Sequence, residues 1–494
     1  MTLLTTLARA EAAATGRAQP QATVRHRHLS NRPLVLIPLT AAGEAAAPLG
    51  ALVGTDRDHP TLLTVPQPRD RDLRFAFLAE LAEIVLPHID SYADDTETET
   101  RKGEDFELCL DAPQLIVPNS PGVDYIRLLG RSMRFRRTAE DDPDTPYPAP
   151  PRVPLLGRWL THYAERARVP GSCLLLSMTG LLTRHWTTGQ SHLEDQHLGA
   201  LLAWLQGEDA THAELARDPR GQLLTPPAGP ATDPAFDNRL LAPAMARYDA
   251  EVPTAAKEIA DLLHSVLRPT WDAVWTGLDL LHTLPEAPRA EARWRGDRWS
   301  YTGHRDRIRA GEPPQPRRDD AVTAARKLAS RERAQAELDA QEALDDPLVM
   351  AGRRLTGEAF AGEVTEVVMA YSEAKRPRPR PLLTIRTEDT PHLAEGTRVY
   401  RDTTAGKPQT AEVVSYDPDD TITVRLTDRM GRGKDPDPGS IPDPGDRLCF
   451  TLFEHAPRGG PGLPDPEDTP WTHGGPPGAL TAEAADTPTA EDFL

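Results

Sequence analysis

The most informative residues of this sequence that could do chemistry are cations on two short loops toward the C-terminus. The first loop, Lys375 to Pro381, alternates arginine with proline, which stiffens the chain. The second loop carries two arginines and a lysine around Gly431 and Gly433. Such cations bind phosphates, and nearby tyrosine rings offer stacking faces for nucleobases. The candidate nucleic-acid-binding residues are Lys375, Arg376, Arg378, Arg380, Arg429, Arg432, Lys434, Tyr371 and Tyr400.

The charge around these loops leaves two interpretations open. Residues 358–454 hold 13 Lys and Arg against 18 Asp and Glu, and the whole chain has a formal net charge of −19. A polyanion is therefore repelled at long range and has to bind at a focal patch. The loops either form that patch, for nucleic acid or for an acidic partner, or are ordinary solvated loops.

Two other groups of residues suggest magnesium or zinc chemistry. Glu373 and Lys375 are spaced as in the last element of many metal-dependent nucleases, where a carboxylate holds magnesium and a lysine steadies the attacking water. No Asp on a partner strand is identifiable for them. His192 and His197 are five residues apart, so on one helix they diverge by about 140° and cannot share an ion. We read them as part of a polar helix face, together with Glu194 and Asp195.

Nucleotide and nucleophile motifs are not found. The string Gly431 to Lys434 lacks the length, the hydroxyl residue and the following helix of a phosphate-binding loop. No Gly-x-Ser-x-Gly elbow is present, and no cysteine has a sequence context that suggests activation. We therefore expect no cofactor, no metal and no catalytic residue, and a protein that binds rather than catalyses.

Bulk composition bears on compartment and on the number of domains. With 494 residues, 50 prolines and 34 glycines, the chain has room for about three folded units plus loops and tails. The three cysteines, Cys109, Cys173 and Cys449, have no disulfide or zinc spacing and fit buried thiols in a reducing compartment. No signal peptide and no long apolar run is evident, so we expect a cytoplasmic protein without a membrane partner.

Apolar patterning in the first third predicts a small α/β unit. After an N-terminal segment, residues 1–28, short apolar runs predict strands, and a stripe from Leu73 to Val85 predicts a helix capped by Asp72. The acidic stretch 93–107 reads as a solvated loop. The unit covers residues 29–139 and ends at a proline-rich linker, residues 140–154. The predicted strands are 34–37, 62–65, 115–117 and 125–129.

Residues 155–318 change to helical periodicity and predict a helical domain. Ser191 and Glu194 have the spacing of a capping box and precede an apolar stripe that begins at Leu198. The predicted helices are 156–167, 173–186, 192–205, 254–267 and 271–281.

The C-terminal third predicts a helix followed by a barrel. Residues 319–350 are charged and alanine-rich, which favours an exposed stalk helix. Residues 357–455 then show six period-two segments between Gly, Pro and Asp turns, typical of a small β-barrel. Residues 456–494, rich in proline, glycine and acids, are expected to be disordered. The predicted fold class is thus α+β and multi-domain.

The C-terminal part resembles a known accessory domain. A charged helix leads into a barrel with Pro381-Leu382-Leu383-Thr384-Ile385-Arg386-Thr387, Glu395-Gly396-Thr397-Arg398-Val399 and Gly445-Asp446-Arg447-Leu448. This pattern resembles the stalk and β-barrel accessory domain of superfamily-one helicases of the nonsense-decay type. The resemblance covers about a quarter of the chain. It implies that the barrel touches nucleic acid beside a motor, whereas no motor motif is found in this sequence.

These observations lead to one functional hypothesis with two alternatives. The hypothesis is a non-catalytic accessory subunit whose barrel binds DNA or RNA and whose helical domain docks a separately encoded helicase or nuclease, in genome maintenance or phage defence. The first alternative is a protein scaffold that does not bind nucleic acid. The second is a divergent metal-dependent nuclease that uses Glu373 and Lys375.

Overall fold

The computed structural model describes residues 3–44, 47–101, 103–207, 229–314, 321–403, 408–417, 421–431, 433–456, 462 and 465. The chain forms two compact units. The larger contains Arg9–Pro20 and Arg25–Leu328, and the smaller contains Met1–Ala8, Gln21–Val24 and Ala329–Gly462. The N-terminal segment predicted as 1–28 is therefore shared between the units. The α+β multi-domain class is confirmed.

A five-stranded mixed sheet is the centre of the larger unit. Three neighbouring strands, β2, β7 and β8, are parallel to one another. Strand β3 pairs antiparallel with β2 on one side and with β4 on the other. In sheet order the strands are β4 (Thr61–Thr64), β3 (Pro48–Gly54), β2 (Leu34–Thr40), β7 (Leu115–Val117) and β8 (Leu175–Ser177).

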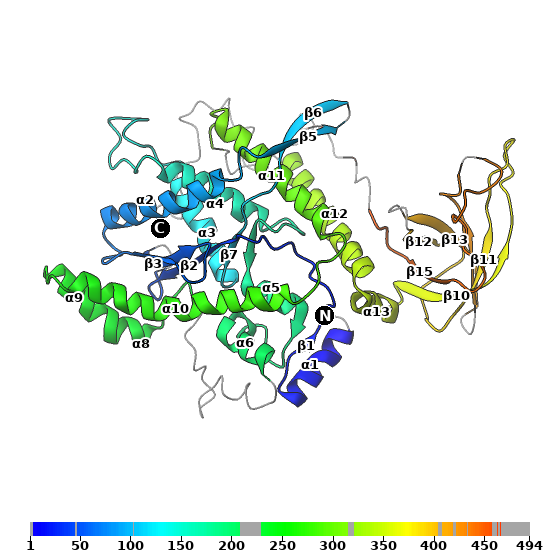
Figure 1. Cartoon of the computed structure of the whole chain (residues 1–494), viewed down its shortest axis with the longest axis horizontal. Helices are drawn as coiled ribbons and strands as arrows, with labels where there is room; N and C mark the ends of the chain where they lie inside the picture. The colour runs from blue at the N-terminus through cyan, green and yellow to red at the C-terminus, as the bar shows by residue number, and fades with distance from the viewer. Residues whose placement is uncertain are drawn as a thin grey trace. The chain divides into compact units, whose positions relative to one another are not determined.

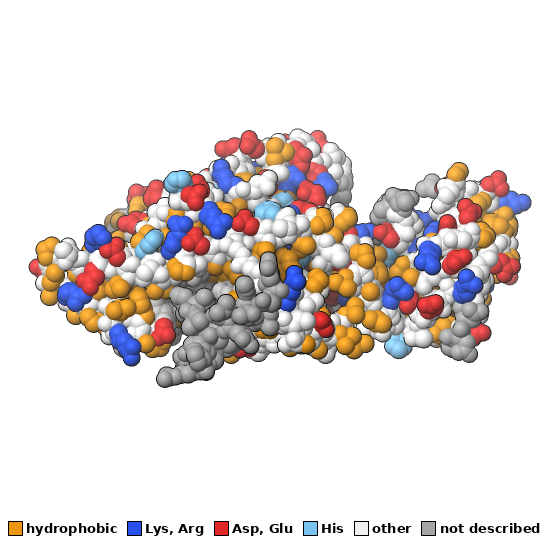
Figure 2. Space-filling model, turned by 60° about the horizontal axis from the view of Figure 1, so that its bottom comes forward, with side chains coloured by type: hydrophobic (Ala, Val, Ile, Leu, Met, Phe, Trp, Pro, Cys, Tyr) orange, Lys and Arg blue, Asp and Glu red, His pale blue; other side chains and the backbone are white. Residues whose placement is uncertain are grey.

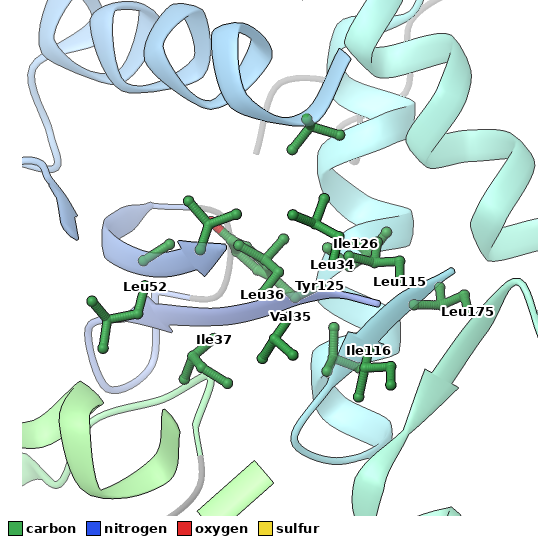
Figure 3. Close-up of a cluster of buried hydrophobic side chains, with 14 of the residues drawn as sticks. Leu34, Val35, Leu36, Ile37, Leu52, Leu115, Ile116, Tyr125, Ile126 and Leu175 are labelled. Carbon is green, nitrogen blue, oxygen red and sulfur yellow. The ribbon is translucent and has the colours of Figure 1, made fainter. Parts of the chain in front are cut away.

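The sheet is covered by helices on both faces, and this explains the composition of its strands. All seven residues of β2 are buried, and a strand buried on both faces reads as a continuous apolar run. Figure 3 shows Val35 and Ile37 on one face of β2 and Leu34 and Leu36 on the other. The principal helices of the unit are α2 (Arg71–Asp90), α3 (Ser120–Met133), α4 (Val153–Arg166), α5 (Met178–His185), α6 (Leu198–Gln206), α9 (Ala242–Asp249), α10 (Ala255–His282) and α11 (Ala290–Arg309).

Short elements complete the N-terminal region and the connections (Figure 1). They are α1 (Leu3–Thr15), β1 (Gln19–Pro20), β9 (Trp186–Thr187), η1 (Glu194–Gln196), α8 (Pro234–Phe236) and the π-helical turn η2 (Asp237–Leu241). No helix among the described residues is long and apolar enough to cross a bilayer.

The segment 140–154, predicted to be a linker between two domains, lies within the larger unit. Strand β8 follows that segment in the sequence, yet it pairs with β7, which precedes it. The predicted α/β unit and the predicted helical domain therefore share one sheet and one hydrophobic core. Parallel pairing needs a long crossover connection, here α3 and α4, so it leaves no local signal in the sequence.

Several predicted elements differ from those in the structure. Residues 125–129, predicted as a strand, lie inside helix α3, whose N-cap Asn119 accepts a hydrogen bond from the amide of Gly122. The predicted helices 254–267 and 271–281 are one helix, α10, which continues through Pro269. Asp70 rather than Asp72 caps α2, with its carboxylate accepting from the amides of Asp72 and Leu73.

The acidic stretch predicted as a loop is a β-hairpin. Strands β5 (Thr96–Arg101) and β6 (Glu104–Cys109) pair antiparallel. On one face the hydroxyl groups of Thr96 and Thr98 donate to the Glu107 carboxylate at 2.8 and 3.0 Å. On the other face Glu97 pairs with Arg298 of α11. The carboxylates are thus held by hydroxyl and guanidinium partners, which a charge count does not reveal.

The smaller unit contains a closed six-stranded barrel, as predicted. Every neighbouring pair of strands is antiparallel, and Phe360 and Phe450 stack in its core with ring centroids 5.5 Å apart. Around the barrel the strands are β10 (Ala359–Val368), β11 (Leu382–Thr387), β14 (Thr421–Leu426), β13 (Gln409–Tyr416), β12 (Arg398–Arg401) and β15 (Arg447–Thr451).

The predicted stalk is two helices, α12 (Ala321–Asp345) and α13 (Pro347–Leu355). The middle of α12 is exposed, with Leu328 58% accessible, but Val322 and Leu338 toward its two ends are buried. Asp346 between the helices is fully buried and caps α13. Most of the tail predicted to be disordered, residues 456–494, lies outside the described residues.

Candidate nucleic-acid interface

The arginine–proline loop forms a hairpin that extends strands β10 and β11 beyond the barrel. Tyr371 pairs antiparallel with Pro379. The amide of Arg380 donates to the carbonyl of Ala370 at 2.7 Å, and the amide of Ser372 donates to the carbonyl of Arg378 at 2.9 Å. We call residues 370–380 the basic hairpin. Its stem is therefore held by main-chain hydrogen bonds between antiparallel strands, the same kind of bond that holds the barrel.

Strand alternation puts Arg378 and Arg380 on one face of the basic hairpin, which we call the arginine face. The residues opposite them in the pairing, Ser372 and Ala370, are small, and the Arg380 guanidinium donates to the carbonyl of Pro379 at 3.1 Å. Arg378 is exposed and Arg380 is half-buried, whereas Pro379 between them is buried. Lys375 and Arg376 lie at the exposed tip.

Proline also determines the hydrogen-bonding capacity of the outer edge of the hairpin arm that carries Arg378 and Arg380. The main-chain groups of Arg378 and Arg380 point toward the other arm of the hairpin, so those of residues 377 and 379 point outward. Both of these residues are proline and carry no amide proton. An edge without donors cannot take up another β-strand.

The second predicted loop leaves the barrel beside the basic hairpin. The amide of Leu426, the last residue of β14, donates to the carbonyl of Pro381 at 3.0 Å. Arg429 follows three residues later, a span of at most about 10 Å. Since neighbouring strands are antiparallel, β10 and β14 end at the same mouth of the barrel where β11 begins. The structure thus brings Arg429 and the hairpin arginines to one end of the barrel.

The second loop is anchored in the barrel and displays its cations. Met430 is buried in the barrel core, and its carbonyl accepts from the amide of Asp437 at 3.0 Å. Arg429 is exposed and has a φ of 60°, a left-handed conformation that is unfavourable for a residue with a Cβ. Lys434 is exposed as well, and Arg432 lies outside the described residues.

Buried polar side chains hold the base of the second loop. The amide group of Gln409 donates to the carbonyls of Asp428 and Ser440 at 3.0 and 3.1 Å. Arg401 donates to the Gln409 side chain at 2.7 Å and to the Ser440 carbonyl, and burial lowers the pKa of this guanidinium. Arg401 is thus a structural cation, and its sequence context does not distinguish it from the exposed arginines nearby.

Several surface arginines of this protein form ion pairs, whereas the cations at this end of the barrel have no acidic partner in the part of the chain that the structure describes. Within the described residues, no carboxylate oxygen lies within 4.0 Å of the side-chain nitrogens of Lys375, Arg376, Arg378, Arg380, Arg429 or Lys434. By contrast, Arg354 near the other mouth pairs with Asp389 at 2.7 Å. Arginines of the larger unit, such as Arg57 with Asp279, also form ion pairs. These six side chains therefore remain available to an external anion.

An exposed apolar strip, Met369 and Tyr371, lies on the first arm of the hairpin, and the sequence did not indicate it. Both side chains are 43% accessible, and Val368, which is 45% accessible, lies on the opposite face because successive residues of a strand alternate. Their exposure follows from the extension of β10 beyond the barrel, where no second layer covers it. Figure 2 shows acidic and basic side chains interspersed over the visible face of the molecule.

Tyr400 does not join the site. It lies on β12, and three inter-strand steps separate β12 from β11 around the barrel. That is about 14 Å at the usual strand spacing. Its hydroxyl donates to the Glu454 carboxylate at 3.1 Å, and burial followed by this contact raises its pKa. Tyr371 is the one predicted tyrosine that the structure places on the basic hairpin.

The residues considered for metal chemistry have other roles or lie apart. Glu373 and Lys375 are exposed at the hairpin tip, and the described residues contain no group of three or more His, Cys, Asp and Glu side chains suited to a metal. The Ser191 and Glu194 capping box forms as predicted but closes the short turn η1. His197 then caps α6 by accepting from the amide of Ala200.

The cysteines are free thiols. Cys109 and Cys173 are buried and Cys449 is half-buried. Burial raises the pKa of Cys173 and of Cys449 to about 11, so both remain protonated near neutral pH. This agrees with the structural role predicted for these two residues.

Comparison with protein-family models, with curated proteins and with solved structures finds no match to this chain.

Proposed function

We propose that this chain is a non-catalytic nucleic-acid-binding accessory subunit that holds phosphates with the basic hairpin. The observation that carries the proposal is the arginine face, on which Arg378 and Arg380 stand without an acidic partner in the described structure. Arg376 and Lys375 extend it at the tip, and Arg429 lies at the same mouth of the barrel. Guanidinium groups of this kind bind phosphate oxygens in a bidentate manner.

The overall charge limits how such a site works. A formal charge of −19 repels a polyanion at long range, whereas the hairpin carries four cations and one acid beyond the barrel. With about four phosphates neutralised, we expect weak, sequence-independent binding, with a Kd of about 10⁻⁶–10⁻⁴ M at physiological salt. A subunit of this affinity needs a partner that supplies further contacts.

The partner in this proposal is a separately encoded helicase or nuclease. What supports an accessory role is the resemblance of the helix and barrel to an accessory domain that accompanies a motor, in a sequence that lacks the motor motif. Co-purification of the full chain with the product of a neighbouring helicase or nuclease gene tests this part. A chain that binds no such product, with or without nucleic acid, would contradict it.

Fluorescence anisotropy of the full-length chain with labelled oligonucleotides at about 50 mM salt tests nucleic-acid binding. Replacing Arg376, Arg378 and Arg380 together with Ser should lower the slope of log K against log salt by about one per arginine. A matched control replaces Arg57, Arg69 and Arg247, exposed arginines that are ion-paired in the larger unit, and should change neither affinity nor slope. Absence of binding at low salt would overturn the proposal.

A second candidate function, protein–protein contact without nucleic acid, is favoured by the apolar strip. Exposed apolar neighbours on one face, such as Met369 and Tyr371, are typical of a docking surface. In that case Met369→Ser with Tyr371→Ser should abolish capture of a protein partner, and the triple arginine variant should leave nucleic-acid affinity unchanged because there is none to lose.

A further inference from the structure

The two faces of the basic hairpin carry different chemistry. Tyr371 and Pro379 form a pair without mutual hydrogen bonds, because the flanking bonds join Ala370 with Arg380 and Ser372 with Arg378. Side chains of directly paired residues lie on one face, and their sequence neighbours lie on the other. The Tyr371 ring is therefore on the face opposite Arg378 and Arg380.

This arrangement is unsuited to a single strand. Proteins that bind single strands combine a basic track for the phosphates with aromatic rings on which the bases stack. Phosphate and base of one nucleotide then contact the same face of the protein. Here a strand with its phosphates on the arginine face cannot stack a base on Tyr371 unless it passes around the edge of the hairpin.

A duplex can bind through its phosphates alone, and the arginine face supplies cations for them. Its bases are already stacked, and its phosphates line both walls of each groove. The major groove of B-form DNA is about 12 Å wide and 8.5 Å deep and admits a two-stranded β-ribbon. The stem of the hairpin, four residues on each arm between Val368 and Leu382, is about 13 Å long and one strand spacing wide. In A-form RNA the major groove is too narrow for this approach.

The outer edge of the strand that carries the prolines also favours a ligand bound by side chains. Residues 377 and 379 have no amide proton, so an extended peptide cannot add to this edge by main-chain hydrogen bonds. The ligand of the arginine face is therefore held by side chains. We propose that the basic hairpin binds double-stranded DNA, with the arginine face toward the phosphates of the major groove. This inference rests on the proposed nucleic-acid binding.

The test compares three ligands of one sequence: a labelled DNA strand of about 20 nucleotides, the same strand annealed to its complement, and the corresponding RNA duplex. The full-length chain and its Tyr371→Ala variant are titrated at about 50 mM salt. We expect the DNA duplex to bind about fivefold or more tightly than either other ligand. Tyr371→Ala should change duplex affinity by less than about twofold, and the triple arginine variant should lose it.

The outcomes separate the two proposals. If none of the three ligands binds, nucleic-acid binding itself is wrong. If the single strand binds as tightly as the DNA duplex, or if Tyr371→Ala weakens binding markedly, the proposed function stands and the duplex inference is overturned. Equal affinity for the RNA duplex overturns the placement in the major groove. As a check of folding, both variants should keep the thermal transition of the unaltered chain.

Discussion

At the scale of single residues, the alternation of arginine with proline has two physical effects. Each proline fixes φ near −65°, which reduces the entropy lost when the hairpin orders. Each also removes an amide donor from the outer edge, where an unpaired strand would otherwise invite aggregation. The arginines between them keep their amides and use them within the hairpin, as the bond from Arg380 to Ala370 shows.

Arg429 is held in a conformation that favours glycine. Its φ of 60° costs about 1 kcal/mol for a residue with a Cβ. We predict that Arg429→Gly is more stable than Arg429→Ala by about 1 kcal/mol, although both lose the charge and bind nucleic acid less tightly. Denaturant unfolding of the two variants measures the difference, and equal stability would show that the backbone relaxes at this position.

Tyr125 has a buried hydroxyl with no hydrogen-bond partner in the described structure. An unsatisfied buried hydroxyl costs about 1–3 kcal/mol. We predict that Tyr125→Phe raises the free energy of unfolding by about 1 kcal/mol. Tyr163→Phe is the matched control, because its buried hydroxyl donates to the Pro113 carbonyl at 2.9 Å, so this variant should lose stability. A loss in both variants would mean that Tyr125 is satisfied in solution.

At the scale of elements, helices α4 and α11 meet at a stacked pair of histidines. The rings of His162 and His304 are 4.1 Å apart and nearly parallel, and the Nε2 atoms of both are buried. Burial, followed by the charge of Arg307, lowers the pKa of His304 to about 3. Burial and the neighbouring His304 lower the pKa of His162 well below its usual range. Both imidazoles are therefore neutral at pH 7.

This pair makes stability depend on pH in a defined direction. The unfolded chain protonates both histidines below about pH 6.5, whereas the folded chain keeps them neutral to much lower pH. The free energy of unfolding should therefore fall as the pH drops from about 6.5 toward 3. We predict that His304→Phe makes this fall shallower in denaturant titrations at a series of pH values.

His59 is the control for this prediction, because its partner acts in the opposite direction. The exposed His59 donates to Asp56, and this hydrogen bond raises its pKa. Its small contribution is present below about pH 6.5 and is lost as the pH rises. His59→Asn should therefore not flatten the acid limb, and an unchanged slope in His304→Phe would contradict the role of the stacked pair.

At the scale of the whole molecule, the smaller unit includes part of the N-terminal segment, which is held there by Asp346. The buried carboxylate of Asp346 accepts from the Thr23 amide at 2.8 Å and from the Thr23 hydroxyl at 2.9 Å. It also accepts from the amide of Leu348 at the start of α13. Two segments more than 300 positions apart in the chain are thus joined at one buried charge.

We predict that Thr23→Val lowers the stability of the smaller unit by about 1–3 kcal/mol, because a buried carboxylate loses a hydrogen-bond donor. Calorimetry of the full chain should show the loss. Residues 329–462 contain no tryptophan, so the tryptophan signal should report the larger unit and change little. Thr365→Val, which removes an exposed hydroxyl that donates to Thr384, is the control and should be close to neutral.

Part of this architecture follows from local pattern. The barrel strands were predictable because alternate residues such as Leu383 and Ile385 are apolar and glycine or proline ends each run. The wrong assignments fell where a tertiary partner overrides composition. The hydrogen bond between Thr98 and Glu107 stabilises two strands in the acidic stretch. The burial of Tyr125 and Ile126 in helix α3 stabilises a helix where the apolar run predicted a strand.

The sequence by itself determined the six barrel strands and the placing of arginine and proline on alternate sides of one of them, because side-chain period is a local property of the chain. Only the tertiary structure decided that β7 and β8 join into one sheet, that Arg429 lies beside the basic hairpin and that Tyr371 points away from the arginines. The first two facts depend on pairing between strands far apart in the sequence, which is set by the burial of a shared core, and the third depends on the register of the hairpin.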